Sequence, residues 1–305
     1  MTEAVLRLNA LSAALPALVL AVLLESALLA AAVALLSRCF TSPAVRCWLW
    51  QVVALKMLLL PLWTVRLLQP EPGVLHKELR APATESRATQ SASVNVTLVG
   101  PPMSVEPAPA EAESFAVASA PGPGWRELTW ASWLLLAWLL GVAWQIAMLA
   151  RQRCRLGGLL RNSHPCDDPA ILGELKQQGG RLGLRWLPRV LVSRDAASPF
   201  VCGLLRPTLV LPESMAAALS GEQLRQVLLH ELAHLRRGDL WWGWLPEAAR
   251  LVWFFHPVTY WVSARVRLER ELACDRLVLA HAGTAADYAD TLVRVAGHCA
   301  QEIET

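Results

Sequence analysis

The amino-acid sequence predicts an α+β membrane protein in which three transmembrane helices precede a cytoplasmic domain with a small β-sheet. Of the 305 residues, 54% are hydrophobic and only 17% are charged, whereas about a quarter of the residues in soluble domains are charged. Three apolar runs are long enough to cross a bilayer, and the C-terminal half has the composition of a globular domain. The net charge of +3 is too small to indicate direct binding of nucleic acid.

The first apolar run, Leu11 to Leu36, exceeds the ~20 residues that a transmembrane helix needs. A cleaved signal peptide is the alternative, but the run is long for one, and Met1 to Arg7 carries no excess of positive charge. The second run is Trp48 to Leu68, and the third is Trp130 to Ala150. Each is expected to form a helix that crosses the membrane.

Arginines set the predicted orientation of these helices. They cluster in the loop between the first two runs and directly after the third: Arg38, Arg46, Arg151, Arg153, Arg155 and Arg161. Because cytoplasmic segments carry the excess of Lys and Arg, we expect the N-terminus outside a bacterial-type inner membrane. The predicted parts are a transmembrane helical hairpin at 1–68, an external disordered linker rich in Pro, Ala, Ser and Glu at 69–124, a third transmembrane helix at 125–150, and a cytoplasmic domain at 151–305.

Glu25 and Lys56 lie near the middles of the first and second apolar runs. An antiparallel hairpin would bring them to the same depth, where each charge lowers the cost of burying the other. We expect a structural ion pair that holds the hairpin together. A role in signalling or substrate passage is the alternative.

The C-terminal domain is expected to contain short strands and two long helices. Arg189 to Ser193, Phe200 to Gly203 and Thr208 to Leu211 are rich in Val and Leu and lie between Pro-containing turns, which is typical of strands. A helix is predicted from Ser220 to Arg237, because Ser220 and Gln223 match a capping box and Gly238 can end the helix. Another is expected from Pro257 past Asp275.

Trp241 to Val262 is apolar and aromatic but contains charged residues and prolines. Such a segment suits a helix lying at the membrane surface better than one that crosses it. A fourth transmembrane helix is the alternative.

His230, Glu231 and His234 form an HExxH motif inside the predicted helix. Residues four apart share a helix face, so both imidazoles can bind one ion. Glu231 is then held beside the metal, where it can take a proton from water and return it to a leaving amine. Two core histidines on an amphipathic helix are the alternative, which the capping box and Gly238 disfavour. Two histidines complete no zinc site, so a third ligand is required.

Glu271 is the predicted third ligand. It shares a helix face with Asp275, which can accept a hydrogen bond from the free ring nitrogen of a ligand histidine. Glu269 would point elsewhere, and Glu269 and Asp239 are expected to be surface groups or supports of the ligands. One Zn²⁺ is the expected cofactor, although such ligands also bind other divalent ions.

Four linked segments, HELAHLRRGD, WFFHP, RELACD and SPFVCGLLRPTLVLP, resemble the BlaR/MecR group of membrane zinc peptidases. The resemblance covers about two thirds of the chain and is more specific than HExxH alone. It implies a gluzincin fold with ligands His230, His234 and Glu271, the base Glu231 and the supporting Asp275. It also implies regulated cytoplasmic proteolysis of a protein substrate, typically a transcriptional repressor, after an external signal.

Members of that family commonly continue into a fourth transmembrane helix and an external sensor domain, whereas this sequence ends at Thr305. We therefore do not carry antibiotic sensing over, and expect either a separate sensor protein or a shortened relative. The leading hypothesis is a zinc metalloendopeptidase in contact with membrane lipids. A non-catalytic signalling scaffold with a retained metal site and a zinc hydrolase of non-peptide substrates are the alternatives. The intact Glu231 disfavours the scaffold.

Zincins usually bind the substrate as an added strand, which points to Phe200–Gly203 or Thr208–Leu211 as the sheet edge; ordinary core strands are the alternative. His256 and Tyr260 are candidates for stabilising the oxyanion, although His256 before Pro257 also fits a helix cap. Four arginines are expected to contact lipid headgroups or acidic neighbours rather than substrate: Arg265, Arg267, Arg270 and Arg276.

Overall fold

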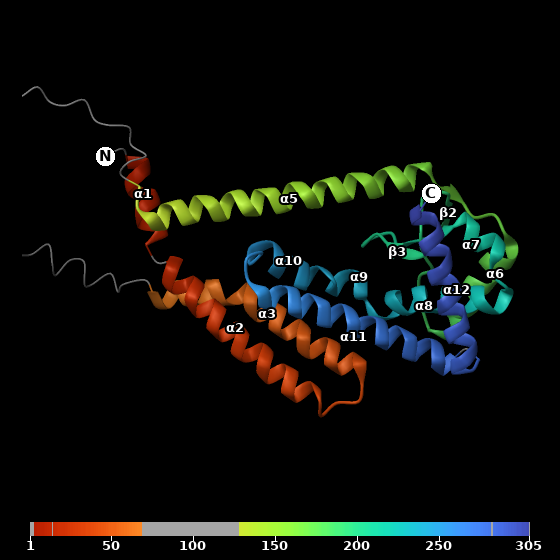
Figure 1. Ribbon diagram of the computed structural model, residues 1–305. Coiled ribbons are helices and arrows are strands. Elements are labelled where there is room, and N and C mark those ends of the chain that lie inside the picture. The colour runs from red at the N-terminus through yellow and green to blue at the C-terminus, as the bar shows by residue number, and fades with distance from the viewer. Residues whose placement is uncertain (1–2, 14, 69–127, 282, 305) are drawn as a thin grey trace, which may run out of the picture.

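The computed structural model describes residues 3–13, 15–68, 128–281 and 283–304 (Figure 1). The predicted external linker at 69–124 lies outside the described residues. Within them, the chain is mostly helical with one small mixed sheet. A helical part formed by α1, α2 and α3 lies at one end of Figure 1, and the sheet with its covering helices lies at the other.

The first predicted membrane helix is divided into α1 (Glu3–Ser12) and α2 (Leu15–Ser37), and α3 (Pro43–Leu68) runs back beside α2. Pro16 lies in the first turn of α2, where its missing N–H breaks no helical hydrogen bond. Lys56 Nζ lies 3.3 Å from Glu25 Oε2, so the predicted pairing is confirmed.

Two stretches of the described chain are long and apolar enough to cross a membrane, Glu3–Ser37 and Trp130–Asn162. The remaining predicted span lies in α3, and a topology with three spans stays a prediction. The predicted domain boundary at residue 150 falls inside α5 (Trp130–Asn162), which continues unbroken into the part of the chain that carries the sheet.

Helix α5 is fixed mainly at its beginning. Ser132 Oγ donates to Asn9 Oδ1 at 2.6 Å and lies 2.9 Å from Ser12 Oγ, which joins α5 to α1. Only Ala131 and Ser132 of its 33 residues are buried. The helix then passes alongside α10 and reaches β2, as Figure 1 shows.

The sheet has the order β1-β2-β4-β3, with a parallel pair in the middle and antiparallel strands outside. The strands are β1 (His164–Pro165), β2 (Arg189–Ser193), β3 (Phe200–Cys202) and β4 (Thr208–Pro212). The last three match the predicted strands to within one residue. Because β4 lies between two strands, it has no free edge. The expectation of substrate addition at Thr208–Leu211 was therefore wrong, and β3 is the edge strand of that pair.

Five helices contribute to one apolar core with the sheet: α6 (Pro169–Arg181), α7 (Glu213–Ala218), α8 (Gly221–Arg237), α12 (Ala285–Glu304) and the end of α11 (Pro257–His281). Leu209 and Leu211 of β4 belong to the same buried cluster as Leu228 and Leu232 of α8, and at most 1% of each residue is exposed. Burying each leucine stabilises the fold by about 2 kcal/mol. The predicted metal-binding helix is thus anchored to the sheet by its apolar face.

The predicted ends of this helix are confirmed. Ser220 Oγ accepts from the Gln223 N–H, and Gln223 Oε1 accepts from the Ser220 N–H, so both halves of the capping box form. Gly238 ends the helix with a φ of 72°, a conformation that glycine adopts without steric cost.

The segment Trp241–Val262 differs from the expected surface helix. It is divided among α9 (Asp239–Trp242), α10 (Trp244–Val252) and the beginning of α11 (Pro257–His281). Its apolar side chains pack against α2 and α3, and Trp253 Nε1 donates to Met57 O, near the middle of the predicted second span. Part of the apolar surface is therefore covered by protein, whereas Trp241, Trp242, Phe255 and Trp261 stay exposed, and contact of these side chains with the membrane surface stays a prediction. Helix α10, with nine residues, is too short for a fourth span.

Candidate metal centre

The three predicted ligands meet where α11 passes α8. His230 Nε2 lies 3.4 Å and His234 Nε2 lies 3.7 Å from the same carboxylate oxygen, Glu271 Oε2. One ligand atom from each of the three residues lies within 4.8 Å of the others. Two imidazoles and one carboxylate around a common point are the ligand set of catalytic zinc sites, which keep a further position open. The residues present therefore fit a divalent cation.

Asp275 and Tyr288 support His230 from behind. The Tyr288 hydroxyl lies 3.0 Å from His230 Nδ1 and donates to Asp275 Oδ1 at 2.7 Å, while that oxygen also lies 3.2 Å from Nδ1. A proton on Nδ1 is thus held by two acceptors, which leaves the Nε2 lone pair for a metal. The sequence indicated Asp275 but missed Tyr288, which comes from α12 and belongs to no motif.

Asp239 supports His234. Asp239 Oδ2 lies 2.9 Å from His234 Nδ1 and accepts a hydrogen bond from Arg237 Nε at 3.2 Å. The carboxylate is buried, so of the two expectations for Asp239 the structure favours the supporting group. The left-handed turn at Gly238 directs the chain back so that Asp239 faces the helix it follows.

A second group of possible ligands, His234, Asp239 and Cys274, lies beside the first. It would use His234 Nδ1, which already contacts Asp239. Burial, followed by the charge of Asp239, raises the pKa of the Cys274 thiol, so the sulfur is protonated in the metal-free protein. This group is better described as the support of His234.

The ligands polarise one another. Burial lowers the pKa of His230, but hydrogen bonds with Asp275 and Glu271 outweigh it and raise the pKa to about 10. For Glu271, burial raises the pKa, but the hydrogen bond from His230 and the charge of His234 lower it to about 2. A cation at Nε2 requires the neutral imidazole, so its binding must release the proton of His230.

Glu231 is buried beside the ligands, with 8% of the residue exposed. Burial raises the pKa of its carboxyl group, and the charges of His234 and His230 oppose the rise. A backbone hydrogen bond from Val201 of β3 also acts on this carboxylate. The general base predicted from the sequence therefore lies between the metal ligands and the free edge of the sheet, with a raised affinity for a proton.

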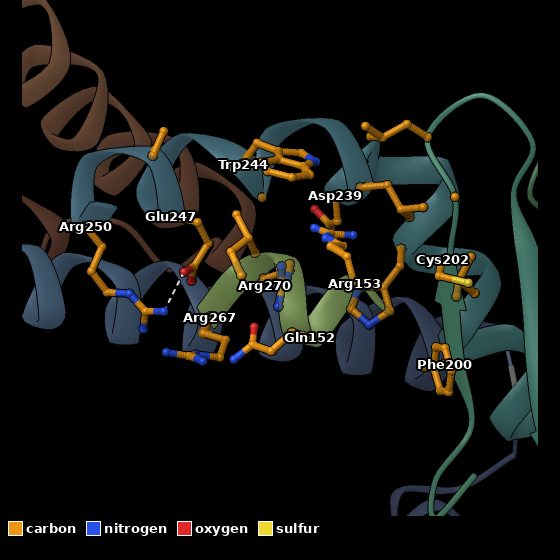
Figure 2. Close-up of a pocket in the computed structure, with 18 of the residues that line it drawn as sticks. Gln152, Arg153, Phe200, Cys202, Asp239, Trp244, Glu247, Arg250, Arg267 and Arg270 are labelled. Carbon is orange, nitrogen blue, oxygen red and sulfur yellow. Dashed lines mark hydrogen bonds and ion pairs between the residues drawn. The ribbon is translucent and has the colours of Figure 1, made fainter. Parts of the chain in front are cut away.

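These groups lie in the wall of an open cavity of about 1130 Å³. Its lining comes from α5, β3, α8, α9, α10 and α11. Figure 2 shows Phe200 and Cys202 of β3 at one end, and Glu247 and Arg250 of α10 toward the other. The space exceeds that of ordinary small-molecule sites, and it is large enough for a segment of polypeptide.

A family model, described as BlaR1 peptidase M56, matches residues 17–304. The chain belongs to the BlaR1 peptidase M56 family. This is a metallopeptidase family, and the resemblance inferred from the linked motifs is confirmed.

The M56 match is supported by individual relatives. Over 147 residues the chain is 27% identical to the regulatory protein BlaR1 of Bacillus licheniformis, covering 47% of this chain and 24% of the relative. Over 87 residues it is 29% identical to the methicillin resistance mecR1 protein of Staphylococcus aureus strain Mu50, covering 28% of this chain and 15% of the relative. The chain thus matches a quarter or less of the length of these curated relatives.

In this M56 member, neither candidate for the oxyanion lies at the cavity. His256 Nδ1 accepts from the Val258 N–H, so the side chain caps α11, and Nε2 lies 2.6 Å from Ser26 Oγ. The Tyr260 hydroxyl donates to Phe254 O at 2.6 Å. Neither residue lines the cavity, so their placement does not support the catalytic expectation.

Glu269 is neither a surface group nor a support of the ligands. It is buried, with 4% of the residue exposed, and Arg46 Nε of α3 donates to its carboxylate at 2.8 Å. The pair joins α3 to α11, so it fixes the helix that carries Glu271 against the helical hairpin.

Proposed function

We propose that this protein is a membrane-bound zinc metalloendopeptidase that hydrolyses a protein substrate at the cytoplasmic face. The observation that carries the proposal is the convergence of His230 and His234 on Glu271, with Glu231 beside them in an open cavity. The substrate we propose is a regulatory protein such as a transcriptional repressor, in line with the family resemblance.

The residues of the chain have distinct parts in this chemistry. His230, His234 and Glu271 would hold Zn²⁺, which when bound acts as a Lewis acid toward water and the scissile carbonyl. Glu231 takes a proton from the attacking water and passes it to the leaving amine nitrogen. Burial favours the protonated state of Glu231, which helps the carboxylate to accept the proton in the first step.

Strand β3 supports a peptide as the substrate. Its outer edge is not paired within the described sheet, and Phe200, Val201 and Cys202 line the cavity. An extended peptide added along this edge would lie beside Glu231, which contacts the Val201 backbone. This arrangement favours a peptidase over a zinc hydrolase of non-peptide substrates.

The proposed membrane topology follows from the arginines after residue 150. Arg153 lies on α5 beyond the apolar stretch and lines the same cavity as the metal ligands. Because positively charged segments stay in the cytoplasm, the cavity would open to the cytoplasm near the membrane.

The proposal is tested with Glu231→Gln in the full-length protein. We expect peptide-bond hydrolysis to fall about 10²–10⁴-fold, the usual contribution of a general base, while zinc binding stays within a few-fold. New N-termini mapped in cells that express wild type should be missing with the variant. Glu222→Gln is the control, because Glu222 lies on the same helix, contacts Arg225 and is exposed. Equal fragment maps from zinc-loaded wild type and Glu231→Gln would favour the scaffold.

A further inference from the structure

Arginines and carboxylates both line the cavity that contains the predicted metal ligands. Four arginines line it, as Figure 2 shows: Arg153 on α5, Arg250 on α10, and Arg267 and Arg270 on α11. The same cavity is lined by four carboxylates: Glu231, Asp239, Glu247 and Glu271. Whether the arginines attract an anion therefore depends on which of these carboxylates already pair with other side chains or belong to the metal centre.

Each carboxylate has a partner or a part in the metal centre. Glu231 and Glu271 belong to the centre, and Asp239 contacts His234 and Arg237. Glu247 lies 2.9 Å from Arg250 Nη2 and neutralises it. Three arginines remain, and we call them the basic wall: Arg153, Arg267 and Arg270.

The basic wall has few anionic contacts of its own. Arg153 stacks over Trp244, with its guanidinium carbon 4.6 Å from the ring centroid. Arg270 Nε lies 3.5 Å from Glu271 Oε1, is buried, and has no hydrogen-bond partner in the described structure. Arg267 is exposed, and no ion pair or hydrogen bond is found for it among the described residues. Among the described residues, Arg153 and Arg267 therefore have no carboxylate to receive their guanidinium donors, whereas Arg270 is already paired with Glu271.

The basic wall lies close to where a peptide bond would be cut. Arg267 precedes Glu271 by four residues, so both lie on one face of α11, about 6 Å apart along the axis. An extended peptide advances about 3.3 Å per residue. With the reach of the side chains included, Arg267 would meet a substrate residue within about three positions of the scissile bond.

The geometry points to a specificity subsite: the basic wall binds an acidic side chain, Asp or Glu, of the protein substrate near the scissile bond. Planar guanidinium groups bind carboxylates through paired, charge-assisted hydrogen bonds. The inference rests on the proposed peptidase function and narrows its substrate class. It departs from the expectation that Arg267 contacts lipid headgroups or acidic neighbours rather than substrate, whereas Arg270 does contact an acidic neighbour, Glu271.

A phospholipid headgroup carries similar charge, but the arrangement favours a peptide. The three arginines share a cavity with Glu231 and the free edge of β3. Arg276, on the same helix but outside the cavity, instead donates to Thr41 O at 3.3 Å. On α11, Arg267 and Arg270 thus line the cavity of the metal centre, whereas Arg276 contacts the loop between α2 and α3.

Binding is measured first, on zinc-loaded full-length Glu231→Gln protein in neutral detergent, so that the result does not depend on turnover. The probes are matched peptides with Asp or Asn at each of three positions on either side of a common cleavable bond. We expect Asp at one position to bind about tenfold more tightly than Asn. Arg267→Gln should remove this preference without weakening binding of the Asn peptide, and Arg267→Lys should keep part of it. Arg276→Gln is the control and should keep all of it.

Equal binding of Asp and Asn peptides at every position would overturn the subsite, as would a preference that survives both Arg267→Gln and Arg270→Gln. Vesicles with and without phosphatidylglycerol are compared in parallel. If Arg267→Gln abolishes binding to phosphatidylglycerol and leaves the peptide preference intact, the basic wall binds lipid and the inference is wrong. Failure of the proposed peptidase function gives a different result from failure of the subsite. Wild-type protein and Glu231→Gln would then hydrolyse every peptide equally slowly.

Discussion

Replacing Tyr288 with Phe should weaken zinc binding, although Tyr288 would not touch the metal. Its hydroxyl lies 3.0 Å from His230 Nδ1 and 2.7 Å from Asp275 Oδ1. The hydroxyl therefore accepts the Nδ1 proton of His230 while it donates its own proton to Asp275, so the carboxylate of Asp275 acts on the imidazole through it. Without the hydroxyl, the imidazole loses one of the two groups that fix its orientation and tautomer.

The size of the effect follows from what remains. Asp275 Oδ1 lies 3.2 Å from His230 Nδ1, so the carboxylate can still accept the proton directly. Loss of a supporting group usually weakens metal binding about 10–100-fold. Because one acceptor survives, we expect the lower end for Tyr288→Phe, about tenfold or 1.4 kcal/mol. Asp275→Ala, which removes the charged acceptor from both Tyr288 and His230, should approach about 100-fold.

The assay is competition for zinc between the purified full-length protein and a fluorescent chelator. Tyr260→Phe is a matched control, because it removes the same hydroxyl from a tyrosine that donates to Phe254 O and lies outside the cavity. Its zinc affinity should equal that of wild type. The reasoning is refuted if folded Tyr288→Phe binds zinc as tightly as wild type, or if Tyr260→Phe weakens binding equally.

Three further outcomes are expected. Zinc affinity should rise about tenfold per pH unit as pH increases toward the His230 pKa of about 10, because zinc binding releases one proton. In the metal-free protein, protonated His230 contributes its full stabilisation below pH 6.5, the ordinary pKa of histidine. That stabilisation is lost as pH rises through about 10. A titration with a flat affinity would contradict this. Arg46→Ala should lower the free energy of unfolding by about 3–5 kcal/mol, because the substitution leaves buried Glu269 unpaired. Denaturant unfolding in detergent measures this free energy, and a loss below about 1 kcal/mol would count against a buried pair. Glu25→Leu and Lys56→Leu should each lower the thermal stability, and the double variant should recover about 1 kcal/mol relative to either single variant. Additive losses would mean that the contact contributes nothing.

The parts of the metal centre that depend on local geometry could be predicted from the sequence. In a helix, the HExxH spacing places His230 and His234 on one face independently of tertiary contacts. Ser220 and Gly238 set the ends of that helix. Tyr288 could not be predicted, because a single tyrosine on α12 has no spacing that indicates where the helix will fold back. Its role exists only in the tertiary structure.

The same distinction explains the errors in the fold. Short runs of Val and Leu between turns identified β2, β3 and β4, but their order in the sheet depends on contacts distant in sequence, so the interior position of β4 was missed. The two-residue strand β1 contains Pro165 and carries no alternating pattern. Trp241–Val262 has the composition of a surface helix, and its packing against α2 and α3, which covers part of its apolar side chains, depends on contacts distant in sequence.

Helix α5 joins two places that the sequence keeps far apart. Its first turn is held by Asn9 and Ser12 of α1, and Arg153, in the cavity wall, lies on the same uninterrupted helix. The 21 residues from Ser132 to Arg153 span about 32 Å. A tilt of only about 5° about the first turn would therefore displace Arg153 by about 3 Å, nearly the advance of one residue in an extended chain. Because Trp138 of the same helix also donates to Val252 O at the end of α10, such a tilt would carry α10 with it or break that hydrogen bond.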